Sequence, residues 1–285
     1  GWAFEFENDS YPDTDDAAEV ILALRQSRLV GTGQEEQRTQ AIDLGVRWLL
    51  SMQSRNGGWG SFDKDNTRTF ITRIPFCDFG ETIDPPSVDV TAHIVEMLGR
   101  LGYRKDYPPI ARALRYIRDE QEYDGCWFGR WGVNYIYGTG AVLPALEAVG
   151  EDMGQPYVRK AVDWVVAHQN QDGGWGESCA SYADSSLRGQ GPSTASQTAW
   201  ALLALLAAGE ADNAATEKGI QYLARTQRED GSWDEPYFTG AGFPGYGIGQ
   251  RMRAAPRPGQ QGYQATALPA GFMINYHLYR DYWPL

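Results

Sequence analysis

The sequence predicts an all-α protein, an α/α toroid of the α6/α6 barrel type built from inner and outer helix pairs. One motif carries most of this prediction: a glutamine, three residues, a glycine, one residue and a tryptophan. It occurs four times, as QSRNGGW, QEYDGCW, QNQDGGW and QREDGSW, beginning at Gln53, Gln121, Gln169 and Gln227. Each copy lies between apolar stretches, and two-helix repeats of roughly 50 to 70 residues pack side by side into a barrel.

The helices are expected in alternation along the chain. Each repeat glutamine should end a helix, because the Asn-Gly or Asp-Gly step after it is turn chemistry in which glycine adopts positive φ. The apolar spacing of Ile42, Val46 and Leu49 illustrates the helix before a glutamine. The second helix of each unit is expected over residues 17–24, 90–101, 133–149 and 196–208. We interpret the repeat glutamine and tryptophan as structural, tying successive helix pairs together.

Composition narrows the function classes. The 285 residues are 42% hydrophobic and fit a single domain over residues 1–285, and the net charge of −12 argues against binding nucleic acid. No run approaches the roughly 20 apolar residues of a spanning helix. The chain has three histidines without HExxH spacing, and Cys77, Cys126 and Cys179 form no CxxC pair. We therefore expect neither a metal nor a cofactor.

The acidic cluster Asp13-Thr14-Asp15-Asp16 begins the first predicted helix and has two interpretations. Asp13 can be an N-cap, with Asp15 and Asp16 favoured by the helix dipole. Alternatively, crowded carboxyl groups cannot all ionise, so one keeps a proton that is available for catalysis. Asp89 and His93 are four residues apart and share a helix face. A single histidine there is commonly a packed core residue, so spacing alone leaves both interpretations open.

Aromatic residues are abundant, with ten Trp, sixteen Tyr and ten Phe. They concentrate in residues 127–138 and in the tail, where Phe272, Tyr276 and Tyr279 have the i, i+4, i+7 spacing of one face of a C-terminal helix. Core packing explains such a stripe. An aromatic wall also stabilises cations, by roughly 2 kcal/mol per dry contact.

Eight blocks are spread over nearly the whole chain: GWAFEF, YPDTDD, IPFCDFGE, DPP, DVTAH, WFGRWGVNYIYGTG, QTAWALLAL and GFPG. Together they resemble blocks of the bacterial squalene–hopene cyclases, which are class II triterpene cyclases. The resemblance implies that Asp15 protonates a terminal alkene of squalene, that Asp13 and Asp16 support it, and that His93 strengthens the acid. Asp89 belongs to the same DVTAH motif. The implied products are hopene or hopanol, formed without a cofactor.

The resemblance also implies a cavity and a substrate channel. Phe76 and Cys77 match the channel constriction, and Phe62 stands where the family often has tyrosine. The residues that match cation-stabilising aromatics are Phe4, Trp131, Tyr137, Phe243, Phe272, Tyr276 and Tyr279. The Gly-, Pro- and Gln-rich loop over residues 246–267 is longer than expected for the family and indicates no function.

Family enzymes have two barrels, so we expect the partner barrel to be absent from this chain, which is expected to be a piece of a longer protein. Gly1-Trp2 matches the end of a fifth repeat. We expect membrane contact through the full-length protein at the cytoplasmic side of a bacterial membrane, and self-association as a homodimer remains open. The alternatives are a prenyl diphosphate cyclase with the same acid motif, an α/α-barrel glycosidase and a non-catalytic isolated barrel.

Overall fold

The computed structural model describes residues 1–4, 8, 10–27, 33–68, 83–182, 184–242, 272–274 and 276–285. The described part is helical, and the predicted all-α class is confirmed. The main helices are α1 (Thr14–Gln26), α2 (Glu35–Met52), α3 (Val88–Arg100), α4 (Pro108–Asp119), α5 (Tyr135–Ala148), α6 (Pro156–Ala167), α7 (Ala195–Ala207) and α8 (Ala214–Thr226). The described part also has two short 3-10 helices, η3 (Cys179–Tyr182) and η4 (Ser185–Leu187), two short strands, β1 (Gly240–Gly242) and β2 (Phe272–Ile274), and one short helix, α9 (Tyr279–Tyr282).

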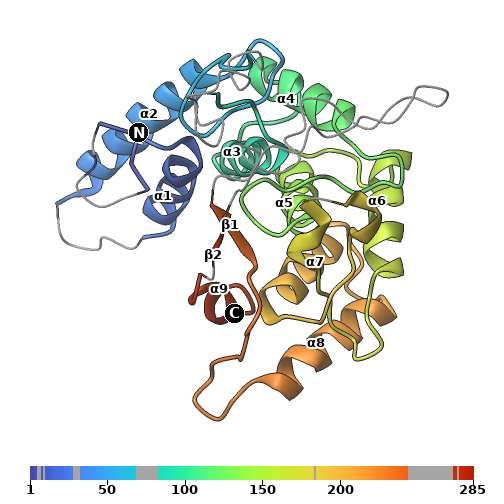
Figure 1. The fold of residues 1–285 in the computed structure, drawn as a ribbon. Helices are drawn as coiled ribbons and strands as arrows, with labels where there is room; N and C mark the ends of the chain where they lie inside the picture. Colours follow the sequence, from blue (N-terminus) through green and yellow to red (C-terminus); the bar gives the residue numbers. More distant parts are fainter. Residues whose placement is uncertain are drawn as a thin grey trace, which may run out of the picture.

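The odd-numbered helices α1 to α7 are inner and the even-numbered helices are outer. Figure 1 shows α2, α4, α6 and α8 along the rim of an arc, with α9 and the C-terminus on its inner side. The inner helices α5 and α7 are buried along most of their length, whereas α4 and α8 bury one face. Inner helices pack in the order α1, α3, α5, α7. The described residues therefore form four helix pairs in an open arc, where an α6/α6 barrel has six.

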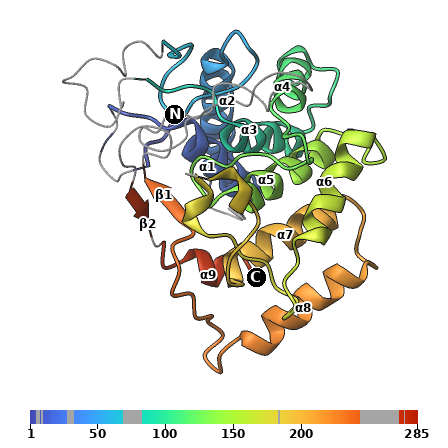
Figure 2. The ribbon, with the colours of Figure 1, turned by 45° about the vertical axis from the view of Figure 1, so that its right-hand side comes forward.

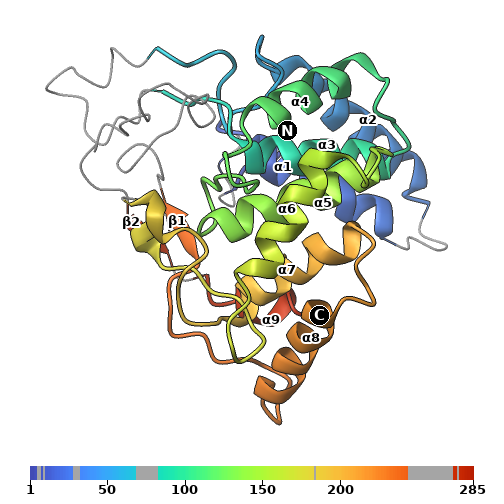
Figure 3. The ribbon, with the colours of Figure 1, turned by 90° about the vertical axis from the view of Figure 1, so that its right-hand side faces the viewer.

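The other views place the remaining elements. In Figure 2, α9 stays next to α7, in agreement with the contacts between these two helices. Figure 3 shows the β1–β2 pair at one edge of the helical arc. Within the described residues, no helix combines the length and the apolar character that crossing a membrane requires.

The repeat motif ties the helix pairs together as the sequence predicts. Each repeat tryptophan donates its indole N–H to a carbonyl ten residues earlier, at the end of the preceding outer helix; the distance is 2.7 Å from Trp59 to Leu49 and 2.7 Å from Trp175 to Val165. The glutamine amide reaches the next outer helix: Gln169 Nε2 donates to the carbonyl of Ala215 at 2.7 Å. The motif glycines have the expected positive φ, between 87° and 112°. The motif therefore links the end of one outer helix to the start of the next through side-chain hydrogen bonds to backbone carbonyls.

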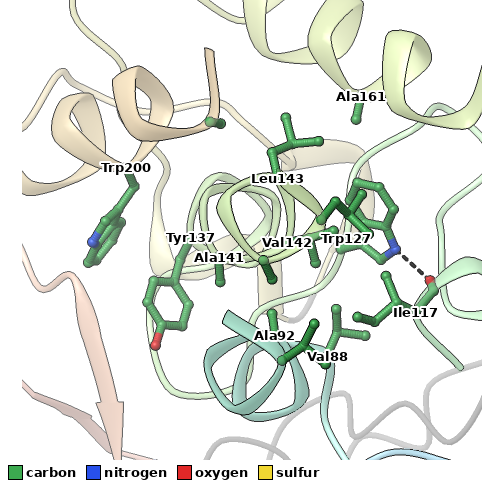
Figure 4. Close-up of a cluster of buried hydrophobic side chains, with 14 of the residues drawn as sticks. Val88, Ala92, Ile117, Trp127, Tyr137, Ala141, Val142, Leu143, Ala161 and Trp200 are labelled. Atoms are coloured by element: carbon green, nitrogen blue, oxygen red, sulfur yellow. Dashed lines mark hydrogen bonds between the residues drawn. The ribbon is translucent and has the colours of Figure 1, made fainter. Parts of the chain in front are cut away.

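Close packing of the inner helices forms the core. Figure 4 shows Val88 and Ala92 of α3 facing Ala141 and Val142 of α5. A methyl group on Gly140 would lie 2.9 Å from Trp200 Cβ, so α5 and α7 approach as closely as they do because this position has no side chain.

The predicted C-terminal helical stripe is wrong. Phe272 belongs to β2, where its Cα pairs with that of Gly242 in β1, and only Tyr279 lies in the short helix α9. Backbone pairing with a strand thirty residues earlier in the chain replaces the local hydrogen bonds that the spacing suggested. The loop over residues 246–267 lies outside the described residues.

Replacing Gln169 by leucine tests the structural role of the motif. Gln169→Leu removes two side-chain hydrogen bonds, to the carbonyls of Gly173 and Ala215, and is expected to lower the free energy of unfolding by about 1 to 3 kcal/mol. Gln227→Leu is the matched control, because this exposed amide donates to the Gly231 carbonyl of its own turn. Urea denaturation measures both, and equal losses would contradict the tying role.

Candidate active site

Asp13 is the N-cap of α1. Its Oδ1 accepts hydrogen bonds from the backbone N–H groups of Asp15 at 2.6 Å and Asp16 at 3.1 Å. The next residue fixes this helix start from the other side, because Thr14 Oγ1 donates to the Gly60 carbonyl at 2.7 Å. The capping interpretation of Asp13 is therefore confirmed, and the acid motif is held against the loop that follows Trp59.

The same cluster also retains a proton near neutral pH. Desolvation, followed by the charges of Asp15 and Asp16, raises the pKa of Asp13 to about 8, although the two backbone hydrogen bonds oppose the rise. Desolvation and the Asp15 charge raise the pKa of Asp16 to about 6. Crowding among the carboxyl groups raises their pKa, as expected. The larger rise is that of the cap residue, Asp13, over that of Asp16, and Asp13 is only 6% exposed.

Asp15 contacts His93 directly. His93 Nδ1 lies 2.6 Å from Asp15 Oδ1, and the two side chains are 11% and 25% exposed. Burial acts to lower the pKa of the imidazole, but the charge and hydrogen bond of Asp15, with the charges of Glu19 and Asp89, raise it to about 10. The ring is therefore protonated at neutral pH, and Nδ1–H donates a charge-assisted hydrogen bond to the carboxylate.

Asp89 holds the loop that precedes α5. Its buried Oδ2 accepts the backbone N–H groups of Arg130 at 2.9 Å and Trp131 at 2.8 Å. Asp89 therefore positions Trp131 and acts on His93 through its charge. One face of α3 therefore contacts both this loop, through Asp89, and Asp15, through His93.

A buried ion pair beside this loop was not predicted as part of the site. Arg130 Nη1 lies 3.1 Å from Asp84 Oδ1, and Asp84 Oδ2 accepts the backbone N–H of Phe62 at 2.6 Å. Phe62 and Trp131 meet edge to face at 6.4 Å, with the Arg130 guanidinium 5.2 Å from the Trp131 ring. Asp84 lies in the DPP block and Arg130 in the WFGRWG block, and the two residues come together only in the folded chain.

Aromatic rings continue from His93 toward the C-terminus. The ring centroids of His93 and Tyr137 are 5.9 Å apart, those of Tyr137 and Trp200 4.8 Å, and those of Trp200 and Tyr279 5.8 Å. Tyr276 stacks on Tyr279 at 4.6 Å. Tyr137 and Trp200 are visible side by side in Figure 4. Trp200, which was not predicted as a site residue, links the two predicted aromatic groups.

A cavity of about 250 Å³ lies against these rings. Four inner helices and the C-terminal segment contribute to it, and none of the described residues that line it is a lysine or an arginine. The residues that line it are Glu19, Leu22, His93, Glu96, Tyr137, Gly140, Ala141, Pro144, Trp200, Leu203 and Trp283.

Other predicted site residues are not brought to this cluster. Phe4 is 66% exposed. Phe76, Cys77, Phe243 and the side chain of Phe272 lie outside the described part of the chain, so their roles stay predictions. Among described residues, no three His, Cys, Asp or Glu side chains group as a metal ion would require.

Comparison with known proteins identifies relatives over most of the chain. Residues 1–252 match the family described as the squalene-hopene cyclase C-terminal domain. A squalene–hopene cyclase of Alicyclobacillus acidocaldarius is 58% identical over 245 residues, which cover 86% of this chain and 38% of that protein. One from Zymomonas mobilis is 45% identical over 289 residues, covering 100% and 40%. The chain thus spans about two fifths of the length of these relatives.

Solved structures support the fold. The type II terpene cyclase MstE from Scytonema aligns with a TM-score of 0.55 at 22% identity, over 82% of this chain and 61% of that one. At this identity the likeness supports the helical toroid alone.

Asp13→Asn tests the buried charge while keeping a capping side chain. The pKa of Asp13 is about 8 in the folded chain and 3.8 as its ordinary value. Between these values the unfolded chain loses the proton before the folded chain does, so the free energy of unfolding falls as pH rises. We expect Asp13→Asn to match the wild-type chain near pH 4 and to exceed its free energy of unfolding by roughly 1 to 3 kcal/mol at pH 9. Urea unfolding at several pH values measures the difference.

Asp43→Asn is the control for this experiment, since Asp43 is exposed on α2. Asp43→Asn should show no comparable gain in the free energy of unfolding at pH 9. An Asp13→Asn gain no larger than that of Asp43→Asn would contradict the buried, protonated cap.

Proposed function

The chain belongs to the squalene–hopene cyclase family, and we propose that it forms the acid-bearing part of a cyclase that converts squalene to hopene or hopanol. The observation that carries the proposal is the 2.6 Å contact between Asp15 and His93 beside a continuous series of aromatic rings. A strong acid next to cation-stabilising rings suits a reaction that begins by protonating an alkene.

The proposed reaction begins with proton transfer from Asp15 to the terminal double bond. The alkene π electrons form the new C–H bond, which leaves a tertiary carbocation on the substrate and a carboxylate on Asp15. Each later ring closes as the next double bond attacks the cation. Loss of a proton gives hopene, whereas capture of water gives hopanol. The aromatic faces of Tyr137, Trp200 and Tyr279 would stabilise the moving positive charge.

Asp15 is proposed as the donor because of its position, although burial and the neighbouring charges raise the pKa of Asp13 to about 8. Asp13 is 6% exposed and its Oδ1 caps α1, so its proton is poorly placed to reach a substrate. The Asp15 side chain is 25% exposed and contacts an imidazolium, which stabilises the carboxylate left after transfer. Asp13 and Asp16 would supply the shared proton of the cluster.

A prenyl diphosphate substrate is less well supported by the described residues. A diphosphate needs cationic or N–H donors, but the cavity beside His93 has two glutamates and no lysine or arginine in its lining. A glycosidase is also a poorer match, since its two carboxylates stand on either side of a bond and the acids here share one tetrapeptide.

We also propose that a second barrel of the same protein covers part of this chain and supplies the rest of the cavity. Leu203 and Leu206 are 38% and 47% exposed on α7, whose other residues are largely buried. Apolar side chains on a core helix indicate a covered surface. Peripheral attachment to the cytoplasmic side of a bacterial membrane, and a homodimer, are proposed for the full-length protein on family resemblance.

The donor role is tested in the longer enzyme that contains this chain, with squalene in detergent and products separated by gas chromatography. Asp15→Asn removes the acidic proton and is expected to lower kcat by about 100-fold or more. Asp43→Asn, an exposed change on α2, should leave kcat unaltered. A rate near that of the wild-type enzyme in Asp15→Asn, with Asp13→Asn inactive, would transfer the donor role to Asp13.

The covered surface is tested on this chain alone. Exposed apolar residues on α7 should make it self-associate and bind an apolar dye, and Leu206→Lys is expected to reduce both. Leu44→Lys is the matched control, because Leu44 is 52% exposed on the outer helix α2. Light scattering and dye fluorescence measure the outcome. A monodisperse wild-type monomer with low dye binding would contradict the covered surface.

A further inference from the structure

Glu19 faces the same cavity as His93. It lies on α1 four residues after Asp15, so the two carboxylates share one face of the helix. The cavity wall includes both Glu19 and His93, together with Glu96 of α3 and Tyr137 of α5. His93 therefore contacts Asp15 through Nδ1 and faces a second carboxylate across the cavity.

In the state that donates a proton, His93 loses the negative charge that stabilises its protonated form. Before transfer Asp15 must be neutral, so its negative charge no longer favours the imidazolium. Burial then acts to release the proton of the ring. A neutral His93 would not stabilise the Asp15 carboxylate that forms on transfer, so another negative charge is needed to keep the ring protonated.

We propose that Glu19 is a positioning residue that keeps His93 protonated while Asp15 carries the proton that it donates. This inference rests on the function proposed above and adds a residue of α1 to it. In the donating state a neutral Asp15 contacts a cationic His93, and an anionic Glu19 lies with His93 on the cavity wall.

Two other carboxylates lie near His93. Asp89 acts on the ring through its charge, but less strongly than Glu19, and its Oδ2 accepts two backbone N–H groups. Glu96 is 3.2 Å from Arg100, which offsets its charge. Desolvation raises the pKa of Glu19 and the His93 charge lowers it. Glu19 is exposed on α1, so solvent screens part of its interaction with His93. Among the described residues, the titratable groups that act on His93 or line its cavity are Asp15 and Glu19 of α1, Asp89 and Glu96 of α3, and Tyr137 of α5.

The experiment measures the titration of His93 by NMR in the histidine-labelled chain. The chain has three histidines, so His93→Gln assigns the signal. Asp15→Asn imitates the protonated acid, because asparagine is neutral and can still accept from Nδ1. In this background, Glu19→Gln is expected to lower the His93 titration midpoint by about one pH unit. Equal midpoints in Asp15→Asn and in the double variant would overturn the proposal.

Glu96→Gln in the same Asp15→Asn background is the matched control. It removes a carboxylate from the same cavity wall, but one that Arg100 already neutralises, so its effect should be clearly smaller. A Glu96→Gln shift as large as that of Glu19→Gln would also overturn the assignment. Circular dichroism confirms that each variant is folded before titration.

A kinetic measurement separates this inference from the proposed function. In the longer enzyme, Glu19→Gln should move the alkaline limb of the kcat profile to lower pH with KM unchanged, and Glu19→Asp should restore part of it. A shifted His93 titration without squalene cyclisation would retain the charge role and reject the function. Cyclisation with an unaltered alkaline limb would retain the function and reject the role of Glu19.

Discussion

The hydrogen bond between Asp15 and His93 is the interaction on which the site depends. It joins the first turn of α1 to the middle of α3, and it places a cation against the carboxylate proposed to give up a proton. Two opposing requirements meet there. Crowding among the three aspartates keeps a proton on the cluster, whereas the imidazolium stabilises the carboxylate formed when a proton leaves.

The fold serves this contact by fixing where α1 and α3 begin. Asp13 caps α1, and Thr14 binds the loop after Trp59. The backbone N–H of Trp59 in turn donates to Thr91 Oγ1 in α3 at 3.0 Å. The repeat tryptophan is therefore structural, but it lies directly between the acid motif and the helix that carries His93. Small residues such as Gly140 then bring α5 and α7 close enough to continue the aromatic series.

Local features of the site could be predicted from the sequence, and long-range ones could not. The capping role of Asp13 and the turn glycines follow from residue type and position, and both are confirmed. Nothing in the spacing joined Asp15 to His93, since 78 residues separate them and only family resemblance did so. Trp200 was missed for the same reason, and the tail was misassigned because β1 offered backbone partners thirty residues away.

The central claim is that Asp15 faces a protonated imidazole. An NMR titration of His93 in the unmodified chain tests it most directly, with signals assigned through His93→Gln. The account predicts a midpoint near the value of about 10 that the surrounding carboxylates impose, well above the ordinary 6.5. A midpoint at or below 6.5 would mean that the ring is neutral at neutral pH, and it would contradict the account.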